Sequence, residues 1–306
     1  MSAILLFFVT STGAAQSCFT LMAYNCENAF DTIHDEGKDD YEFLPEGSYH
    51  WSRSRMFRKL NNIGKVIMAV DTEHPVDIVC LEEVENDSVL TWLTQRTALS
   101  QIGYKYVMTE SADTRGIDVA LVYSPFTFRL LDSESLRAKT SSPTRDVLHV
   151  CGTTPGGDTL DIFAVHLPSR LNGKVAERNR QIIAEMINSH IDSISMARPN
   201  AQICIMGDFN DGPRSNIVKR AFAGMTNLMT DGKQGSYKYH GVWDCIDQIL
   251  VNESLHGKVT EAGVYSNPML TEDDIQYGGT KPFRTYIGRK YNKGFSDHLP
   301  VFFKIR

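Results

Sequence analysis

The sequence lacks several short motifs that would each assign a chemistry. Its 306 residues contain no Cys-x-x-Cys pair, no Gly-x-Ser-x-Gly segment and no Gly-x-x-x-x-Gly-Lys loop. These absences argue, in that order, against a zinc site held by paired cysteines, against the serine nucleophile of an α/β-hydrolase and against P-loop hydrolysis of nucleotides. The sequence also has no internal repeat, low-complexity tract or linker-like change of composition. It therefore predicts one compact domain.

Positive charge is in short supply, because 31 Lys and Arg residues stand against 37 Asp and Glu residues for a formal net charge of −6. A protein that holds long nucleic acid by charge alone is usually basic. Net acidity still permits a phosphate substrate if local basic residues and a bound cation supply the attraction. Hydrophobic residues make up 42% and charged residues 22% of the chain, which is typical of a soluble globular protein.

Long apolar runs are absent after the N-terminus, so no later segment is expected to cross a bilayer. The N-terminus carries a short apolar core at residues 4–9, followed by small residues up to Ala15. We expect a signal peptide at residues 1–16 and a domain at residues 17–306; a buried first strand or a lipid anchor on Cys18 are the alternatives. Export would place the protein in the periplasm or outside the cell. Disulfides are permitted there, but the spacing of the six cysteines names no pairs.

Seven short apolar runs have the length and β-branched content of buried strands. They are residues 21–24, 78–81, 119–123, 160–165, 203–206, 249–251 and 301–303. Residues 56–70 and 183–194 instead repeat their apolar residues at helical spacing, and Ser52 or Ser54 is expected to cap the first helix. Apolar strands mixed with amphipathic helices indicate an α/β fold in which helices cover the sheets.

Several of the apolar runs end in a carboxylate, an amide or an imidazole. The residues at these ends are Asn25, Glu82, Glu83, His166, Asp208 and Asn210. Polar groups at the ends of core strands converge where ligands bind in α/β folds. Any one of them could be a turn or capping residue, but four such endings together are difficult to explain as turns.

Two motifs carry the most specific chemistry. Asp208 and Asn210 lie two residues apart, so on an extended segment the carboxylate and the amide face one way, toward a cation, a water or a phosphate oxygen. Asp297 and His298 precede the last apolar run and suit metal binding with proton transfer. Alone, the first motif could be a turn and the second a surface pair. Together they indicate hydrolysis in which Mg²⁺ neutralises phosphate charge and His moves protons.

Segments between residue 21 and the C-terminus resemble, in order, the motifs of the endonuclease/exonuclease/phosphatase superfamily, the deoxyribonuclease I-like proteins. The segments are Asn25-Cys26-Glu27-Asn28, Glu82-Glu83-Val84, Gly116-Ile117-Asp118, His166-Leu167-Pro168, Gly207-Asp208-Phe209-Asn210, Ile246-Asp247-Gln248 and Ser296-Asp297-His298. The superfamily includes pancreatic-type deoxyribonuclease, abasic-site endonucleases, inositol-polyphosphate phosphatases and bacterial sphingomyelinases. The likeness is greatest to its exported bacterial members.

The resemblance implies a four-layered α/β sandwich, in which two facing, mostly antiparallel sheets have helices outside. It also implies a Mg²⁺ or Mn²⁺ site formed by Asn25, Glu83 and Asp297, with Glu83 as the principal ligand. Glu82 stands where the superfamily usually has Gln, a departure that adds a charge near the metal.

The resemblance also implies the catalytic roles. His298, oriented by Asp247, would take a proton from the attacking water. Asp208 would position that water or assist the base, and Asn210 and His166 would hydrogen-bond the phosphoryl oxygens.

Residues that would contact substrate are less sharply indicated. Arg115, Arg170 and Arg284 are candidates because they would supply local positive charge. Lys174, Arg178 and Arg180 could do the same, with a solvated helix start as the alternative. Tyr237, Tyr239 and Trp243 could stack on bases or pack beside a strand. The acidic stretch at residues 31–55 is expected to form a long loop at the rim of the site.

Three hypotheses of function follow. The leading one is an extracytoplasmic phosphodiesterase, a monomer that acts as a nuclease on DNA or RNA. The second is a phosphomonoesterase or a sphingomyelinase-like phospholipid-headgroup hydrolase. The net negative charge of the chain favours such small substrates. The third is a binding protein without catalysis, and the intact set of candidate site residues argues against it.

Overall fold

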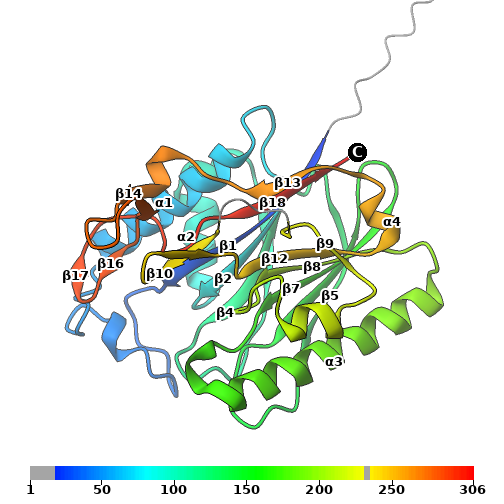
Figure 1. Ribbon diagram of the computed structural model, residues 1–306. Coiled ribbons are helices and arrows are strands. Elements are labelled where there is room, and N and C mark those ends of the chain that lie inside the picture. Colours follow the sequence, from blue (N-terminus) through cyan, green and yellow to red (C-terminus); the bar gives the residue numbers. More distant parts are fainter. Residues whose placement is uncertain (1–17, 231–234) are drawn as a thin grey trace, which may run out of the picture.

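The computed structural model describes residues 18–230 and 235–306. The expected signal peptide at residues 1–16 lies outside the described residues. Two six-stranded sheets dominate the fold (Figure 1). Among the described residues, no helix is long and apolar enough to cross a membrane.

The first sheet has the strand order β13-β18-β1-β2-β4-β3. Its strands are β1 (Phe19–Ala29), β2 (Ile78–Val84), β3 (Lys105–Met108), β4 (Asp118–Tyr123), β13 (Val259–Val264) and β18 (Val301–Ile305). Neighbouring strands are antiparallel except β1 and β2, which run parallel. The polar residues in the last parts of β1 and β2 therefore lie at the same edge of the sheet.

The second sheet has the order β5-β6-β7-β8-β12-β9 and repeats this plan. Its strands are β5 (Arg129–Leu136), β6 (Val147–Thr153), β7 (Thr159–His166), β8 (Gln202–Asp208), β9 (Thr226–Asn227) and β12 (Asp247–Val251). Only β7 and β8 run parallel. The two strands end together, with His166 opposite Asp208 in the register.

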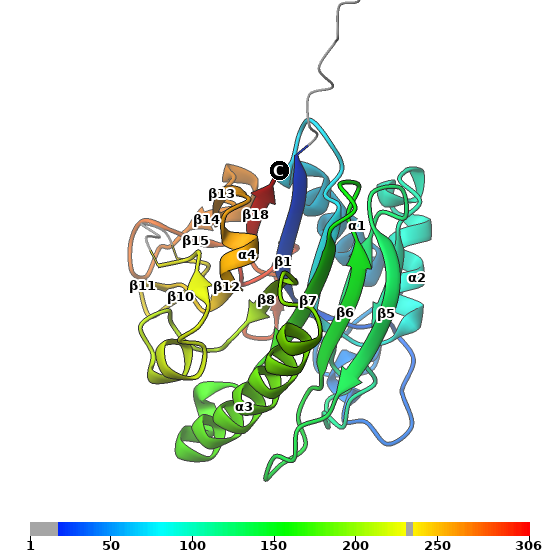
Figure 2. The same ribbon diagram turned by 90° about the vertical axis from the view of Figure 1, so that its right-hand side faces the viewer.

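The sheets pack face to face through alternate apolar side chains, such as Leu21 and Cys80 of one sheet and Ile162 and Met206 of the other. The opposite faces are covered by helices. Helices α1 (Arg53–Val70) and α2 (Asp87–Arg96) pack on the first sheet, and α3 (Gly173–Ala197) packs on the second (Figure 2). The predicted four-layered sandwich is confirmed.

All seven predicted strands are present, as are both predicted helices. The apolar face of α1 is buried over its whole length, from Met56 to Val70. Ser52 stands at the N-cap position of α1, but its side chain makes no capping bond and its Oγ instead lies 3.0 Å from Ser54 Oγ. In the described chain the six cysteines are all free.

Short elements connect the sheets and helices. They are η1 (Tyr41–Phe43), η2 (Ala98–Gln101), η3 (Arg170–Asn172), η4 (Ile217–Ala221), α4 (Glu253–His256), η5 (Pro268–Leu270), and the hairpins β10 (Tyr237–Tyr239) with β11 (Val242–Asp244), β14 (Thr271–Asp273) with β15 (Thr280–Pro282), and β16 (Tyr286–Ile287) with β17 (Lys290–Tyr291). The long connection from β1 to α1 contains η1, so it is only partly an irregular loop.

Gly207 is the one position near the end of β8 where only glycine fits. Its φ of +134° is a conformation that residues with a side chain rarely adopt, and an added Cβ would press against the carbonyl oxygen of Val165 and lie 2.7 Å from Glu82 Oε1. This close approach allows β7 and β8 to end with their polar residues side by side.

We expect Gly207→Ala to lower the free energy of unfolding by roughly 2–5 kcal/mol, since backbone strain and overpacking add. Gly263→Ala in β13 is the matched control, because an added Cβ there meets nothing within 4 Å. It should change stability by less than about 1 kcal/mol. Urea unfolding of both variants tests this, and equal midpoints for the two would contradict the steric argument.

Candidate active site

The candidate residues gather where the two parallel strand pairs end. Asn25 in β1 pairs with Glu82 in β2, while His166 and Asp208 close β7 and β8. The amide of Asn25 joins the two sheets, because its Nδ2 lies 3.4 Å from Glu83 Oε1 and 3.2 Å from Asp208 Oδ2. The sequence-based prediction that these strand ends converge is confirmed by this geometry.

The backbone conformation of Glu83 sets the direction of its side chain. It sits at an irregularity in the pairing of β2 with β4 and has a φ of +62°, which is costly for a residue with a side chain. The carboxylate accepts a hydrogen bond from the backbone N–H of Asn28 at 2.9 Å, and its Oε1 lies 3.9 Å from His166 Nε2. No Lys or Arg pairs with Glu83 among the described residues. Its negative charge is therefore open to a cation.

Glu82 points the other way. Since Cys80 faces the layer between the sheets, strand alternation places Glu82 in that layer too, fully buried. Neither carboxyl oxygen has a hydrogen-bond partner in the described chain. Burial and the negative charges of Asp247 and Asp208 raise the pKa of Glu82 well above its ordinary value. A protonated Glu82 has the shape and neutrality of Gln, so the departure from the superfamily pattern adds no charge.

Asp208 is held by amide groups. Its Oδ1 accepts from the backbone N–H of Asn210 at 2.7 Å, and its Oδ2 lies 3.2 Å from the Nδ2 of both Asn25 and Asn210. Asn210 Nδ2 also donates to the Leu167 carbonyl at 3.0 Å. Both amide hydrogens of Asn210 are thus engaged, and the predicted contact with a phosphoryl oxygen would require one of these bonds to break. Burial, with the charge of Asp247, raises the pKa of Asp208 to about 7.

His298 and Asp247 form a buried pair. His298 Nδ1 lies 2.9 Å from Asp247 Oδ2, which also accepts from the Ser236 hydroxyl. This arrangement leaves His298 Nε2 free to face the site, 4.0 Å from Asp297 Oδ1. Burial alone would lower the pKa of His298, but the neighbouring carboxylates, Asp247 above all, outweigh it and raise the pKa well above its usual value. The ring centroids of Tyr237 and His298 lie 4.9 Å apart.

His166 is the second imidazole of the site, and its pKa is shifted in the opposite direction from that of His298. Its Nε2 lies 3.5 Å from Asp208 Oδ2, while its Nδ1 is buried without a partner in the described chain. Burial, followed by the positive charges of Arg145 and Arg115, lowers the pKa of His166 well below its usual value. A neutral imidazole in this position can exchange hydrogen bonds with a phosphate but brings no charge.

The three candidate substrate arginines are each tied to acidic partners. Arg115 lies 3.9 Å from Asp113. Arg170 donates to Asp244 at 2.9 Å and to the carbonyl of Asn210 at 2.8 Å.

Arg284 donates to Asp297 at 3.0 Å and to Glu27 at 3.2 Å.

Of the three cations at the start of α3, Arg180 is buried against the Pro168 carbonyl, so the alternative of a solvated helix start holds only for Lys174 and Arg178.

Sequence reasoning missed a buried chain of charges behind Arg284. The Lys59 side chain is fully buried, with Nζ 2.6 Å from Thr285 Oγ1 and 3.8 Å from Glu27 Oε2. Glu27 in turn contacts Arg284, which contacts Asp297. Glu27 belongs to the Asn25-Cys26-Glu27-Asn28 motif, so the sequence could have pointed to it. Lys59 occupies an ordinary polar position of an amphipathic helix, and no sequence signal marks it as buried.

The donor set fits a divalent cation. Glu83 presents a carboxylate that pairs with no Lys or Arg in the described chain, the kind of oxygen ligand that Mg²⁺ and Mn²⁺ prefer. Asn25 turns its Nδ2 toward Glu83 and its Oδ1 accepts from the backbone N–H of Glu27, so its amide would have to turn over to offer oxygen to a cation. Asp297, the third predicted ligand, contacts His298 and Arg284 instead. Asp208, Asp247 and His298 also lie close enough to share an ion. Since His298 Nδ1 is already bonded to Asp247, we interpret that deeper group as a proton-transfer network.

Comparisons with known proteins agree with this architecture. A model of the endonuclease/exonuclease/phosphatase family matches residues 20–306. A family protein of that description from Bacteroides thetaiotaomicron is similar in structure, with 17% identity, a TM-score of 0.63 and coverage of 94% of this chain and 98% of that one. A mannosyl-6-phosphatase from the same organism has 16% identity and a TM-score of 0.62, covering 94% and 100%. The human Nocturnin catalytic domain has 18% identity and a TM-score of 0.59, covering 94% of each chain.

At these identities the solved structures show the fold alone, and no curated protein sequence matches the chain. The sandwich and its rim of carboxylates, amides and imidazoles define a phosphate-ester hydrolase scaffold, of a kind that generally uses a divalent metal. The chain belongs to the endonuclease/exonuclease/phosphatase family, since the family model covers nearly its whole length.

The protonated state of Glu82 predicts a pH-dependent effect of Glu82→Gln on stability. The folded protein holds this proton more tightly than the unfolded chain, so wild-type stability falls as the pH rises above about 4.5. Gln has no such dependence. The variant should gain on the wild type by up to about 1.4 kcal/mol per pH unit. Thermal unfolding in EDTA from pH 5 to pH 8 measures the difference, and parallel curves would show that Glu82 is ionised.

Proposed function

We propose that this protein is a metal-dependent hydrolase of phosphate esters. The observation that carries the proposal is the buried His298–Asp247 pair beside Asp208, facing a Glu83 carboxylate that no Lys or Arg neutralises among the described residues. A base, a water-positioning acid and an open anionic ligand are the groups that such a hydrolysis needs.

The side chains divide the work by their contacts. His298 presents Nε2 to the site while Asp247 fixes the ring through Nδ1, so Nε2 is the atom that takes a proton from the attacking water. Asp208 holds that water on the carboxylate that the amides of Asn25 and Asn210 orient. His166, neutral and buried, donates from Nε2 to a phosphoryl oxygen.

A divalent cation bound at Glu83 and Asn25 would supply charge neutralisation of the phosphate and lower the proton affinity of the acidic site. The carboxylates that raise the pKa of His298 act on the metal-free site, and an added positive charge opposes them. A bound cation would therefore favour the neutral, proton-accepting form of His298.

Small phosphate esters are favoured as substrates over long nucleic acids. The net charge is −6, and each candidate arginine already has a carboxylate partner. A similar structure is described as a mannosyl-6-phosphatase, a phosphomonoesterase. One observation favours the nuclease hypothesis, because the exposed Tyr239 on the β10–β11 hairpin could stack on a base.

An extracytoplasmic location is part of the proposal. It is supported by the apolar core at residues 4–9 and the small residues that follow it.

We expect His298→Ala and Asp208→Ala to reduce kcat/KM for bis-p-nitrophenyl phosphate or p-nitrophenyl phosphate at least about 100-fold with Mg²⁺ present, because general-base catalysis contributes roughly 10²–10⁴-fold. His256→Ala on the exposed α4 is the control and should retain wild-type rates. Steady-state kinetics on purified protein measure both. Wild-type turnover by either site variant would rule out these roles.

EDTA should abolish hydrolysis by the wild type, and added Mg²⁺ or Mn²⁺ should restore it. A panel that also contains plasmid DNA, RNA, inositol phosphates and sphingomyelin ranks the substrate classes under the same conditions. Turnover that persists in EDTA would contradict a metal-dependent mechanism.

A further inference from the structure

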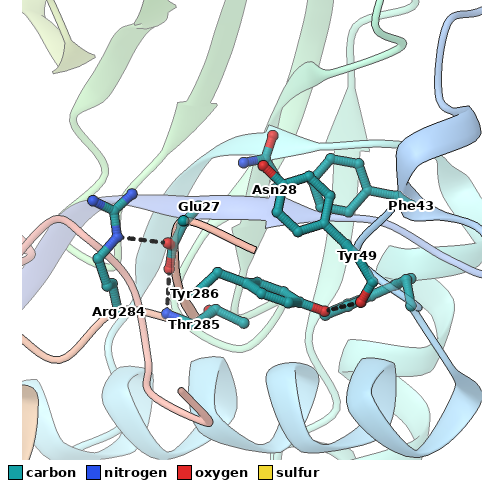
Figure 3. Close-up of a pocket in the computed structure, with 9 residues that line it drawn as sticks. Glu27, Asn28, Phe43, Tyr49, Arg284, Thr285 and Tyr286 are labelled. Atoms are coloured by element: carbon teal, nitrogen blue, oxygen red, sulfur yellow. Dashed lines mark hydrogen bonds and ion pairs between the residues drawn. The ribbon is translucent and has the colours of Figure 1, made fainter. Parts of the chain in front are cut away.

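A pocket of about 310 Å³ opens beside the candidate active site (Figure 3). Its walls come from the end of β1, from the β1–α1 connection and from the segment that leads into β16. A volume at the low end of the ~300–1,000 Å³ range of small-molecule sites holds one compact group and not a polymer.

Two wall residues connect the pocket to the reaction centre. The backbone N–H of Asn28 donates to Glu83 Oε2 at 2.9 Å, and Arg284 Nη2 donates to Asp297 Oδ2 at 3.0 Å. A phosphate placed at Glu83 would therefore have its ester oxygen within reach of the pocket mouth. The pocket is in position to receive the alcohol part of the substrate.

Phe43, the central aromatic residue of the pocket wall, has no free face for a flat ring. Phe43 stacks on Phe30 with ring centroids 4.3 Å apart and on Tyr49 at 4.8 Å, so both of its faces are covered. Tyr49 also meets Tyr286 in an edge contact at 4.8 Å. A base could stack on Phe43 only if one of these pairs separated, and the aromatic contacts form an apolar floor.

The remaining wall is polar and has unused hydrogen-bonding capacity. The side-chain amide of Asn28, a donor and an acceptor, has no partner among the described residues, and neither has Nη1 of Arg284. Figure 3 shows the Asn28 amide and the Arg284 guanidinium on either side of Glu27. The Asn28 amide, which donates and accepts, and the Arg284 Nη1, which donates, both match hydroxyl groups, since a hydroxyl can donate and accept.

This polar wall is fixed in place. Glu27 accepts from Arg284 at 3.2 Å and from the backbone N–H of Thr285 at 2.6 Å, and the buried Lys59 holds Thr285 from below. Asn28 has a φ of +59°, a conformation that Asn tolerates better than most residues. A preorganised polar wall loses little entropy when a ligand binds.

We propose that this pocket binds a compact, hydroxyl-rich leaving group, so that the enzyme acts on phosphate esters of sugars or other polyols. The proposal rests on the proposed phosphoesterase function and specifies its substrate class. Apolar C–H faces of the polyol lie on the aromatic floor while its hydroxyls bond to Asn28 and Arg284. A substrate without hydroxyls leaves these groups unpaired and is disfavoured.

Asn28→Gly tests the pocket, because Gly removes the amide, tolerates the positive φ and keeps the N–H that binds Glu83. Lys293→Gly is the matched control, since Lys293 is exposed and also has a positive φ of +68°. For each protein, kcat/KM with Mg²⁺ is measured for a hexose 6-phosphate, for methyl phosphate and for p-nitrophenyl phosphate. Thermal unfolding confirms that the variants are folded.

Asn28→Gly should lower kcat/KM for the hexose 6-phosphate at least about 10-fold, with methyl phosphate changed less than about 2-fold and Lys293→Gly unchanged on all three esters. An equal loss on methyl phosphate would show that Asn28 acts only through Glu83 and would overturn the proposal. A larger loss on p-nitrophenyl phosphate would assign the pocket to flat rings and overturn it as well. Absence of metal-dependent turnover of every ester by the wild type would overturn the proposed function itself.

Discussion

The fold has to accommodate several carboxyl groups buried between two sheets with few cations to balance them. Asp208, Asp247 and Glu82 are all nearly inaccessible. His298 hydrogen-bonds to Asp247, and the neutral His166 lies 3.5 Å from Asp208 without adding charge. Burying an unpaired charge is costly. The structure meets this cost in three ways: Asp247 pairs with His298, Glu82 keeps its proton, and the raised pKa of Asp208 reduces its charge near neutral pH. At Glu83, nearer the surface, the imbalance is left for a cation.

This concentration of acids follows from the topology. Each sheet contains one parallel strand pair, β1–β2 or β7–β8, in an otherwise antiparallel arrangement. A parallel pair ends both strands at one edge, and face-to-face packing brings the two edges together. The antiparallel β12 begins where β8 ends, so Asp247 stands opposite Asp208 in the register. Gly207 permits the close approach that this requires. Residues far apart in sequence thereby form one network.

Most of the fold and the membership of the site could be predicted from sequence, because apolar periodicity reports burial and polar residues at strand ends report the shared edge. The strands, α1, α3 and the gathering of Asn25, Glu83, His166 and Asp208 were accessible in this way. The acidic partners of the arginines could not be predicted from sequence. Arg284 depends on Glu27, 257 residues away along the chain, and Lys59 on Thr285, 226 residues away. Both pairings arise where the loop before β16 docks against β1 and α1, and that loop carries no periodic signal.

These loop contacts have a consequence for substrate selection. An arginine that already bonds to a carboxylate cannot steer a long polyanion as a free cation does, since its field is largely cancelled nearby. Arg284 is joined to both Glu27 and Asp297, so it serves better as a fixed hydrogen-bond donor at short range. If the proposed function holds, recognition comes from directed bonds within a small volume, and a divalent cation at the site would attract the phosphate. The same ion pairs that stabilise the rim therefore support the part of the proposal that prefers a small, hydrogen-bonding ester to a polymer.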